Sequence, residues 1–197
     1  MNGAPSPPSD VDPPLAGVRV LDLTRLLPGP MCTLYLADLG ADVVKVEDTG
    51  AGDYARTLAI RPASKRDRTT AWFNAINRNK RSLAIDLKHA DGNAAFLALA
   101  KEADVIVEGF RPGVVAALRI DYDTIRAINP RVVYCSLSGY GQTGPRAAVA
   151  GHDINYLGYA GTLNYTGQRG GAPALANLQI ADLLGGAATA AIGILAA

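Results

Sequence analysis

The chain has 197 residues, of which 49% are hydrophobic and 19% are charged, and its formal net charge is +1. This composition is typical of one folded domain, and a charge so near zero gives no reason to expect a nucleic acid or an acidic membrane as partner. The longest apolar run, residues 183–197, is shorter than the roughly 20 residues that a helix needs to cross a bilayer, so no membrane span is expected.

The amino terminus and the cysteines indicate the compartment. Residues 1–14 are rich in Pro, Ser and Asp and lack the basic and apolar regions of a signal peptide, so we expect a disordered leader followed by one domain, residues 15–197. Cys32 and Cys135 fit neither a disulfide framework nor a metal site. We therefore predict reduced thiols, no metal and a cytoplasmic protein.

Strands alternate with helices along the chain. The expected strands are residues 18–23, 42–47, 82–87, 105–110 and 132–137, and the expected helices are residues 31–39, 71–76, 91–102, 112–118 and 122–128. Alternation at this spacing predicts an α/β fold, a doubly wound parallel sheet with helices on both faces. Residues 183–197 indicate a further apolar helix, which we expect something else to cover.

Ligands of such sheets bind beyond the carboxyl ends of the strands. The loops expected there are residues 26–30, 47–53, 86–88, 109–113 and 138–144, most of which contain glycine or proline. None matches the glycine fingerprint of a dinucleotide site or a P-loop, which disfavours a nicotinamide or ATP enzyme.

Two segments near the end of the chain carry acid/base groups. GHDINY (residues 151–156) contains His152, and ADLLGG (residues 181–186) contains Asp182. An imidazole titrates near neutral pH, and a carboxyl group in a dry pocket can be raised toward it, so the pair suits proton transfer at a carbon next to a carbonyl. Taken by residue type alone, His152 could instead be structural and Asp182 could simply cap a helix.

The stretches LAGVRVLDL, LPGP, LADLGADVVKVE, NRNKRSLAIDLK, ADVIVEGFRPG, NPRVVYCSLSGYGQTGP and AGHDINY resemble the amino-terminal half of a family III CoA-transferase (CaiB/BaiF). That family includes formyl-CoA transferase and α-methylacyl-CoA racemase. The resemblance implies a Rossmann-like domain that binds acyl-CoA, with coenzyme A as part of the substrate and no prosthetic group. It also implies an interlocked homodimer for the full-length protein, which has a second half and a small domain that this chain lacks.

The resemblance assigns site residues in two groups. In transferases an aspartate, here Asp182, attacks the thioester and carries the acyl group as a mixed anhydride; in the racemase branch His152 and Asp182 would serve opposite faces of the α-carbon. The implied CoA contacts are Asp86, Leu87 and Lys88, then Gly109, Phe110 and Arg111, and in GHDINY Gly151, Asp153, Ile154, Asn155 and Tyr156.

Because both His152 and Asp182 are present, the preferred function is racemisation of a 2-methylacyl-CoA. CoA transfer between carboxylic acids is the first alternative, and the second alternative is that the chain is an inactive truncated remnant. Two racemase-type arginines are replaced, by Asp48 and Ala117. Lys45, Arg78, Lys80 or Arg81 could compensate. The helix starts at Asp153 and Asp182 are the candidate donors to an enolate oxygen.

Overall fold

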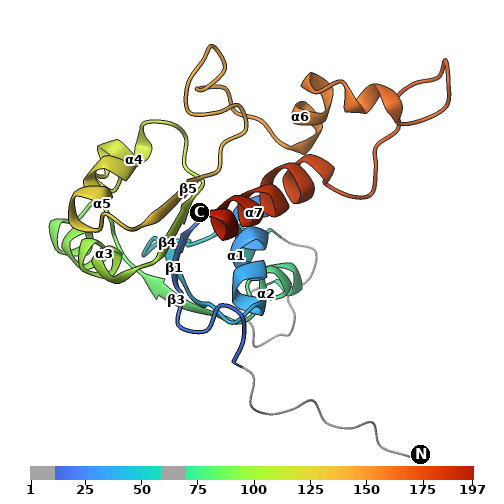
Figure 1. Ribbon diagram of the computed structural model, residues 1–197. Coiled ribbons are helices and arrows are strands. Elements are labelled where there is room, and N and C mark those ends of the chain that lie inside the picture. The colour runs from blue at the N-terminus through green and yellow to red at the C-terminus, as the bar shows by residue number, and fades with distance from the viewer. Residues whose placement is uncertain (1–11, 59–69) are drawn as a thin grey trace, which may run out of the picture.

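The computed structural model describes residues 12–58 and 70–197. Its centre is a five-stranded parallel sheet in the order β3-β2-β1-β4-β5 (Figure 1). The strands are β1 (Arg19–Leu23), β2 (Asp42–Glu47), β3 (Lys80–Ala84), β4 (Val105–Glu108) and β5 (Val133–Ser136). The predicted parallel α/β fold is confirmed, and the strand order is that of the Rossmann type.

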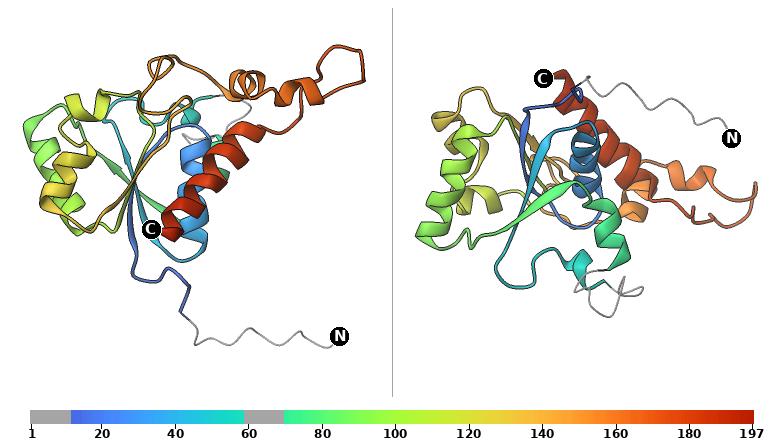
Figure 2. Two further views of the ribbon diagram at one scale, coloured as in Figure 1. Left: turned by 45° about the horizontal axis from the view of Figure 1, so that its top comes forward. Right: turned by 90° about the horizontal axis from the view of Figure 1, so that it is seen from below.

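Helices cover both faces of this sheet (Figure 2). One face carries α1 (Pro28–Asp38) and a carboxyl-terminal helix made of a π-helical part, η3 (Ala181–Ala188), and an α-helical part, α7 (Thr189–Ala196). The other carries α3 (Ala90–Glu102), α4 (Val114–Ala117) and α5 (Tyr122–Ile128). The remaining helices are η1 (Tyr54–Arg56), α2 (Ala71–Ile76), α6 (Asp153–Tyr159) and η2 (Thr162–Tyr165).

Two apolar cores fix this arrangement, because successive strand residues point to opposite faces of the sheet. In β1, Val20 faces Cys32 and Leu36 of α1, whereas Leu21 and Leu23 belong to the core under α3 and α5. The carboxyl-terminal helix closes the first core with Ala187, Ala191 and Ile194. The expected apolar helix is therefore covered along one side by α1 and the sheet.

Several predicted boundaries are wrong, and the largest differences are in α1, β3 and the last helix. Helix α1 begins at Pro28 rather than at residue 31, because a proline fits the first turn of a helix. Strand β3 runs from Lys80 rather than residue 82, since the Lys80 ammonium is drawn into the interior, and it ends at Ala84 before a turn in which the His89 N–H donates to the Asp86 carbonyl. The last helix begins at Ala181 and is π-helical for eight residues.

Parts of two predicted segments lie outside the described residues. These are residues 1–11 of the expected leader and residues 59–69 of the irregular region before α2. Pro13, at the start of the described part, accepts a hydrogen bond from the Ala16 N–H at 2.9 Å. Among the described residues, no helix is both long and apolar enough to span a membrane.

Candidate active site

His152 and Asp182 lie on two short helical elements that meet beside the carboxyl edge of the sheet. His152 occupies the N-cap position of α6, and Asp182 lies in the first turn of η3. The carboxylate of Asp153 accepts a hydrogen bond from the Asp182 N–H at 3.0 Å. This contact joins the two elements at their amino-terminal ends, so the structure brings the two predicted acid/base residues into one neighbourhood.

The surroundings of Asp182 raise the pKa of its carboxyl group. Burial raises the pKa of Asp182, the negative charge of Asp153 raises it further, and a positive charge on His152 opposes them. The net direction is upward. A raised pKa brings a carboxyl group closer to the pH range in which it can both accept and return a proton. His152 is exposed and Asp182 is partly buried, so the pair is open to a ligand in this chain.

The structure corrects the interpretation of Asp182 as a helix cap and places His152 at a cap position instead. Asp182 is not an N-cap, because Ile180 holds that position. The His152 N–H donates to the Asn155 side-chain oxygen at 2.9 Å, and the Asn155 N–H donates back to the His152 carbonyl at 2.8 Å. Since Asp153 already accepts from the Asp182 N–H, that N–H is not free for an enolate oxygen. Only the start of α6 is left of the two predicted donor sites.

An aromatic cluster holds the segment before His152. The Tyr156 hydroxyl donates to the Gly151 carbonyl at 2.7 Å, and the Tyr140 ring meets the Tyr156 ring edge to face at 5.2 Å between centroids. A Cβ on Gly139 would lie 2.3 Å from the Tyr156 hydroxyl oxygen, so only glycine fits there. Through these contacts Tyr140 and Tyr156 pack together and fix the backbone that leads into His152.

The other predicted contact residues lie along the same edge without forming one cluster. Asp86, Leu87 and Lys88 follow β3, and Gly109, Phe110 and Arg111 follow β4. Strands β2 and β1 separate them, which corresponds to about 14 Å at the usual strand spacing. Leu87 and Phe110 pack against the core, whereas Lys88 and Arg111 are exposed. A ligand touching both groups must therefore be long.

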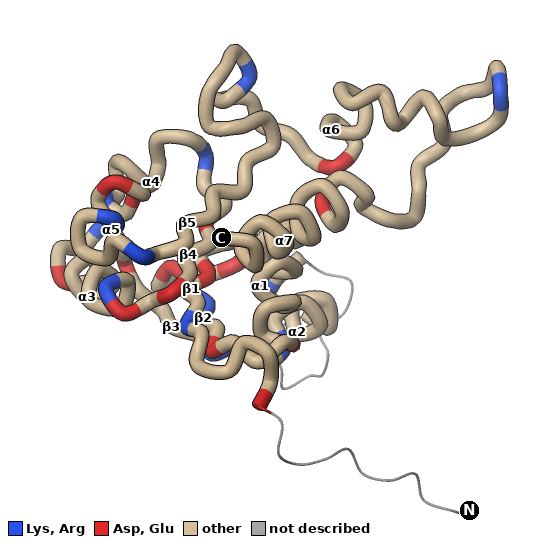
Figure 3. The backbone as a smooth tube through the Cα atoms, viewed as in Figure 1, with Lys and Arg blue, Asp and Glu red and all other residues tan. Residues whose placement is uncertain are grey.

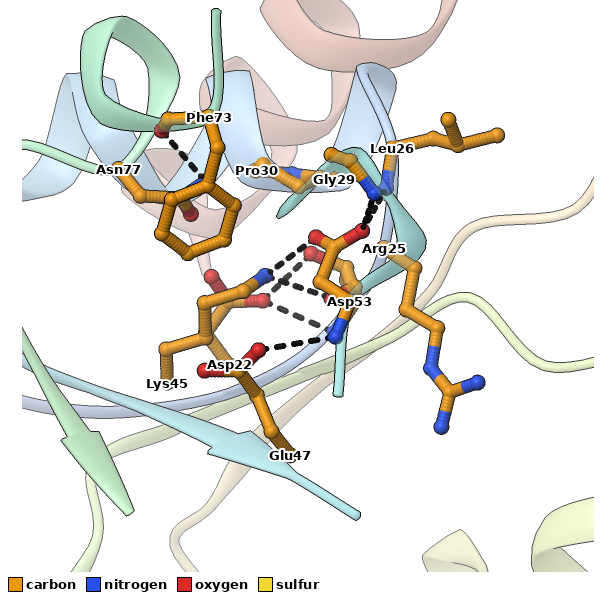
Figure 4. Close-up of polar contacts among 12 residues, drawn as sticks. Asp22, Arg25, Leu26, Gly29, Pro30, Lys45, Glu47, Asp53, Phe73 and Asn77 are labelled. Carbon is orange, nitrogen blue, oxygen red and sulfur yellow. Dashed lines mark hydrogen bonds and ion pairs between the residues drawn. The ribbon is translucent and has the colours of Figure 1, made fainter. Parts of the chain in front are cut away.

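A buried network of charges beside these loops was not predicted (Figure 4). Lys45 pairs with Asp53 at 3.0 Å, and Lys80 pairs with Asp22 at 3.1 Å, all four being almost fully buried. Burial opposes the ionisation of Asp22, but Lys45 and Lys80 outweigh it and lower its pKa to about 2. The only signal in the sequence was a charged residue inside each of two apolar strands, Asp22 and Lys45, a pattern that ordinarily indicates an exposed face.

This network takes up Lys45 and Lys80, two of the four cations proposed to replace the missing arginines. Lys45 and Lys80 face inward, and Arg78 and Arg81 form exposed ion pairs with Asp38 and Asp42. Asp48 itself accepts from the Arg25 guanidinium at 2.8 Å. Arg25, from the loop after β1, is therefore the cation that the structure places beside Asp48, and sequence reasoning did not identify it.

Other features lie away from this pair. Burial raises the pKa of Cys32 to about 12, which confirms it as an inert packing residue. A cavity of 340 Å³ between α4, α5 and β5 is lined by Gly113, Tyr122, Tyr134 and Gln142, among others, and by none of the predicted site residues. Among residues 12–58 and 70–197, no group of three or more His, Cys, Asp or Glu is placed to hold a metal ion.

A parallel α/β domain whose carboxyl edge carries glycine- and proline-rich loops, with His152 and Asp182 brought together beside it, has the architecture of an enzyme that binds a small-molecule ligand. The chain belongs to CoA-transferase family III, whose family model matches residues 15–197. This confirms the resemblance found in the sequence.

The relatives include both kinds of enzyme considered above. The chain is 41% identical to a succinate–glutarate CoA-transferase of Agrobacterium fabrum, covering 88% of this chain and 44% of the relative. It is 39% identical to the α-methylacyl-CoA racemase of Homo sapiens, covering 93% and 43%. A crystal structure of a CaiB/BaiF family protein from Brucella suis superposes with a TM-score of 0.88 at 38% identity, covering 94% and 49%. The chain thus spans half or less of the length of these relatives.

Proposed function

We propose that the protein acts on acyl-CoA thioesters and racemises or epimerises the carbon next to the thioester carbonyl of a 2-methylacyl-CoA. Family membership supports the substrate class. The observation that carries the reaction type is the junction of α6 and η3, where the Asp182 N–H donates to the Asp153 carboxylate at 3.0 Å and so holds Asp182 beside the residue next to His152. As in the family it resembles, the full-length protein is proposed to work as a homodimer, with coenzyme A entering as part of the substrate.

The proposed step needs two groups on opposite faces of one carbon. One of His152 and Asp182 removes the α-proton, and the electron pair moves onto the thioester oxygen to form an enolate. The protonated partner then delivers a proton to the other face, and the electron pair returns from the oxygen. Because the α-proton is a very weak acid, hydrogen-bond donors must stabilise the enolate oxygen, each typically contributing about 3 kcal/mol. At the start of α6, the N–H groups of Asp153 and Ile154 are the donors proposed for this role, because those of Asn155 and Tyr156 already donate to the His152 carbonyl.

CoA transfer is the second candidate, and the transferase names of several relatives favour it. In that reaction the Asp182 carboxylate attacks the thioester carbonyl, the coenzyme A thiolate leaves, and an aspartyl mixed anhydride remains. This chemistry needs Asp182 ionised and gives His152 no required role. The presence of His152 beside Asp182 supports the proton-transfer reaction over this one, because proton transfer uses both groups.

The test is incubation of the full-length protein with a 2-methylacyl-CoA in deuterated water. We expect deuterium at the α-carbon, detected by mass spectrometry, and its loss in both His152→Ala and Asp182→Asn. His89→Ala is the matched control, because His89 is the other of the two histidines in the chain and lies exposed at the N-cap of α3. Transfer of CoA to a free acid that survives His152→Ala but not Asp182→Asn would establish the alternative instead.

A further inference from the structure

The last quarter of the chain contains very few charges. Residues 147–197 include three charged side chains, Asp153, Arg169 and Asp182, and the tube is almost wholly tan there (Figure 3). Two of these three, both acidic, act on each other across the junction of α6 and η3. Among the described residues, neither aspartate forms an ion pair with a lysine or an arginine. Like charges placed together are unfavourable unless a cation offsets them or one group holds a proton, and the positive charge that acts on Asp182 here is that of His152.

Asp153 makes this junction through its side chain rather than its backbone. Its Oδ1 atom accepts the Asp182 N–H at 3.0 Å, while the neighbouring His152 backbone is held separately by Asn155. The start of η3 is thereby tied to the residue next to His152. A hydrogen bond to an ionised acceptor is stronger than a neutral one, so this contact is suited to hold two elements in register.

We propose that Asp153 is a positioning residue for the proton exchange, fixing the Asp182 backbone beside His152 and placing a negative charge next to the Asp182 carboxyl group. This inference rests on the proposed function. It assigns the side chain of Asp153 a task different from the coenzyme A contact that the family resemblance implied for this residue.

The groups around Asp182 determine how the charge acts. The charges of His152 and Asp153 shift the pKa of Asp182. Burial raises the pKa of the Tyr156 phenol, and the negative charge of Asp182 raises it further. The elements packed against η3 add little: α1 carries only Asp38, at its far end, and β5 and α7 carry no charged residue. Because Asp153 raises the pKa of Asp182, removing its charge must lower that pKa.

Two variants separate the hydrogen bond from the charge. Asp153→Asn keeps an oxygen that can accept the Asp182 N–H but removes the charge, so the acid limb of the deuterium-exchange rate should move to lower pH. Asp153→Ala removes both, so the limb should move in the same direction and the maximal rate should also fall by about tenfold or more, as expected when a catalytic group is misplaced. Asp91→Asn is the matched control, since Asp91 is a first-turn acid of α3 whose side chain is 95% exposed.

A second measurement keeps this proposal separate from the reaction. Carbon-13 NMR of labelled aspartate carboxyls in the full chain reports the titration of Asp182 without substrate, and we expect it to move to lower pH in Asp153→Asn and to stay in place in Asp91→Asn. An unchanged Asp182 titration in Asp153→Asn would overturn the role of Asp153, whatever the enzyme does. Absence of deuterium exchange in the unaltered protein, with the titration shifted as expected, would count against the proposed reaction only.

Discussion

At the scale of single residues, the molecule places its charges in two contrasting ways. The interior between β1, β2 and β3 holds Asp22, Lys45, Asp53 and Lys80 as opposite charges that compensate one another. The region of Asp153 and Asp182 holds like charges that do not. The first arrangement lowers the pKa of Asp22 to about 2 and stabilises loops, whereas the second raises the pKa of Asp182 and suits it to exchange a proton.

The buried ion pair of Lys80 and Asp22 predicts that substitutions of the neighbouring residues Lys80 and Arg81 differ strongly in their effect on stability. The Lys80 ammonium also donates to the Pro30 carbonyl at 2.8 Å and to the Asn77 side-chain oxygen at 2.9 Å, so Lys80→Met would leave three buried acceptors short of a donor. We expect the free energy of unfolding to fall by about 3–5 kcal/mol.

Arg81→Met is the control, because Arg81 pairs with Asp42 on the surface and such pairs contribute about 0–1 kcal/mol. Urea denaturation of both variants measures the difference. Equal losses in the two variants would contradict the structural role assigned to Lys80.

At the scale of elements, the π-helical start of the last helix sets the position of Asp182. Its sequence, ADLLGGAA, contains three alanines and two glycines, and the Thr189 hydroxyl donates to the Leu184 carbonyl five residues back at 2.8 Å. Short π-helical stretches are often found at functional sites. Helix η3 packs on α1 at Gly186, where a Cβ would lie 2.9 Å from the Pro28 Cβ.

Alanine substitutions at the two adjacent glycines of η3 are therefore expected to have opposite effects on the free energy of unfolding. Gly186→Ala would push η3 away from α1 and should lower the free energy of unfolding by about 1–3 kcal/mol, as overpacking does. A Cβ on Gly185 would meet no atom within 4 Å, so Gly185→Ala should be neutral or stabilise the chain by about 0.5–1 kcal/mol. Thermal melts followed by circular dichroism distinguish them, and a Gly186→Ala variant as stable as Gly185→Ala would show that η3 is free to move.

At the scale of the whole molecule, the sequence predicted the alternation of strands and helices, the parallel sheet and the loops at its carboxyl edge. These features follow from apolar periodicity, which tertiary packing here reinforces. The inward-facing Lys80 shifted β3, because a buried lysine looks like a surface residue until its partner, 58 positions away, is known. The hydrogen bond from the Asp182 N–H to Asp153 could not be predicted either, because the two residues are 29 positions apart in the sequence.

The same architecture predicts how stability is distributed along the chain. Strands β1 and β4 are central in the sheet and almost wholly buried, so their amide hydrogens should exchange with solvent only through global unfolding. Residues 167–179 are exposed throughout and extend away from the sheet (Figure 1), so their amides should exchange within the shortest times sampled. Edge strand β3 is more exposed than β1 and should be intermediate. Hydrogen exchange read by mass spectrometry measures all three regions in one experiment, and protection of residues 167–179 equal to that of β1 would mean that a second surface covers them in solution.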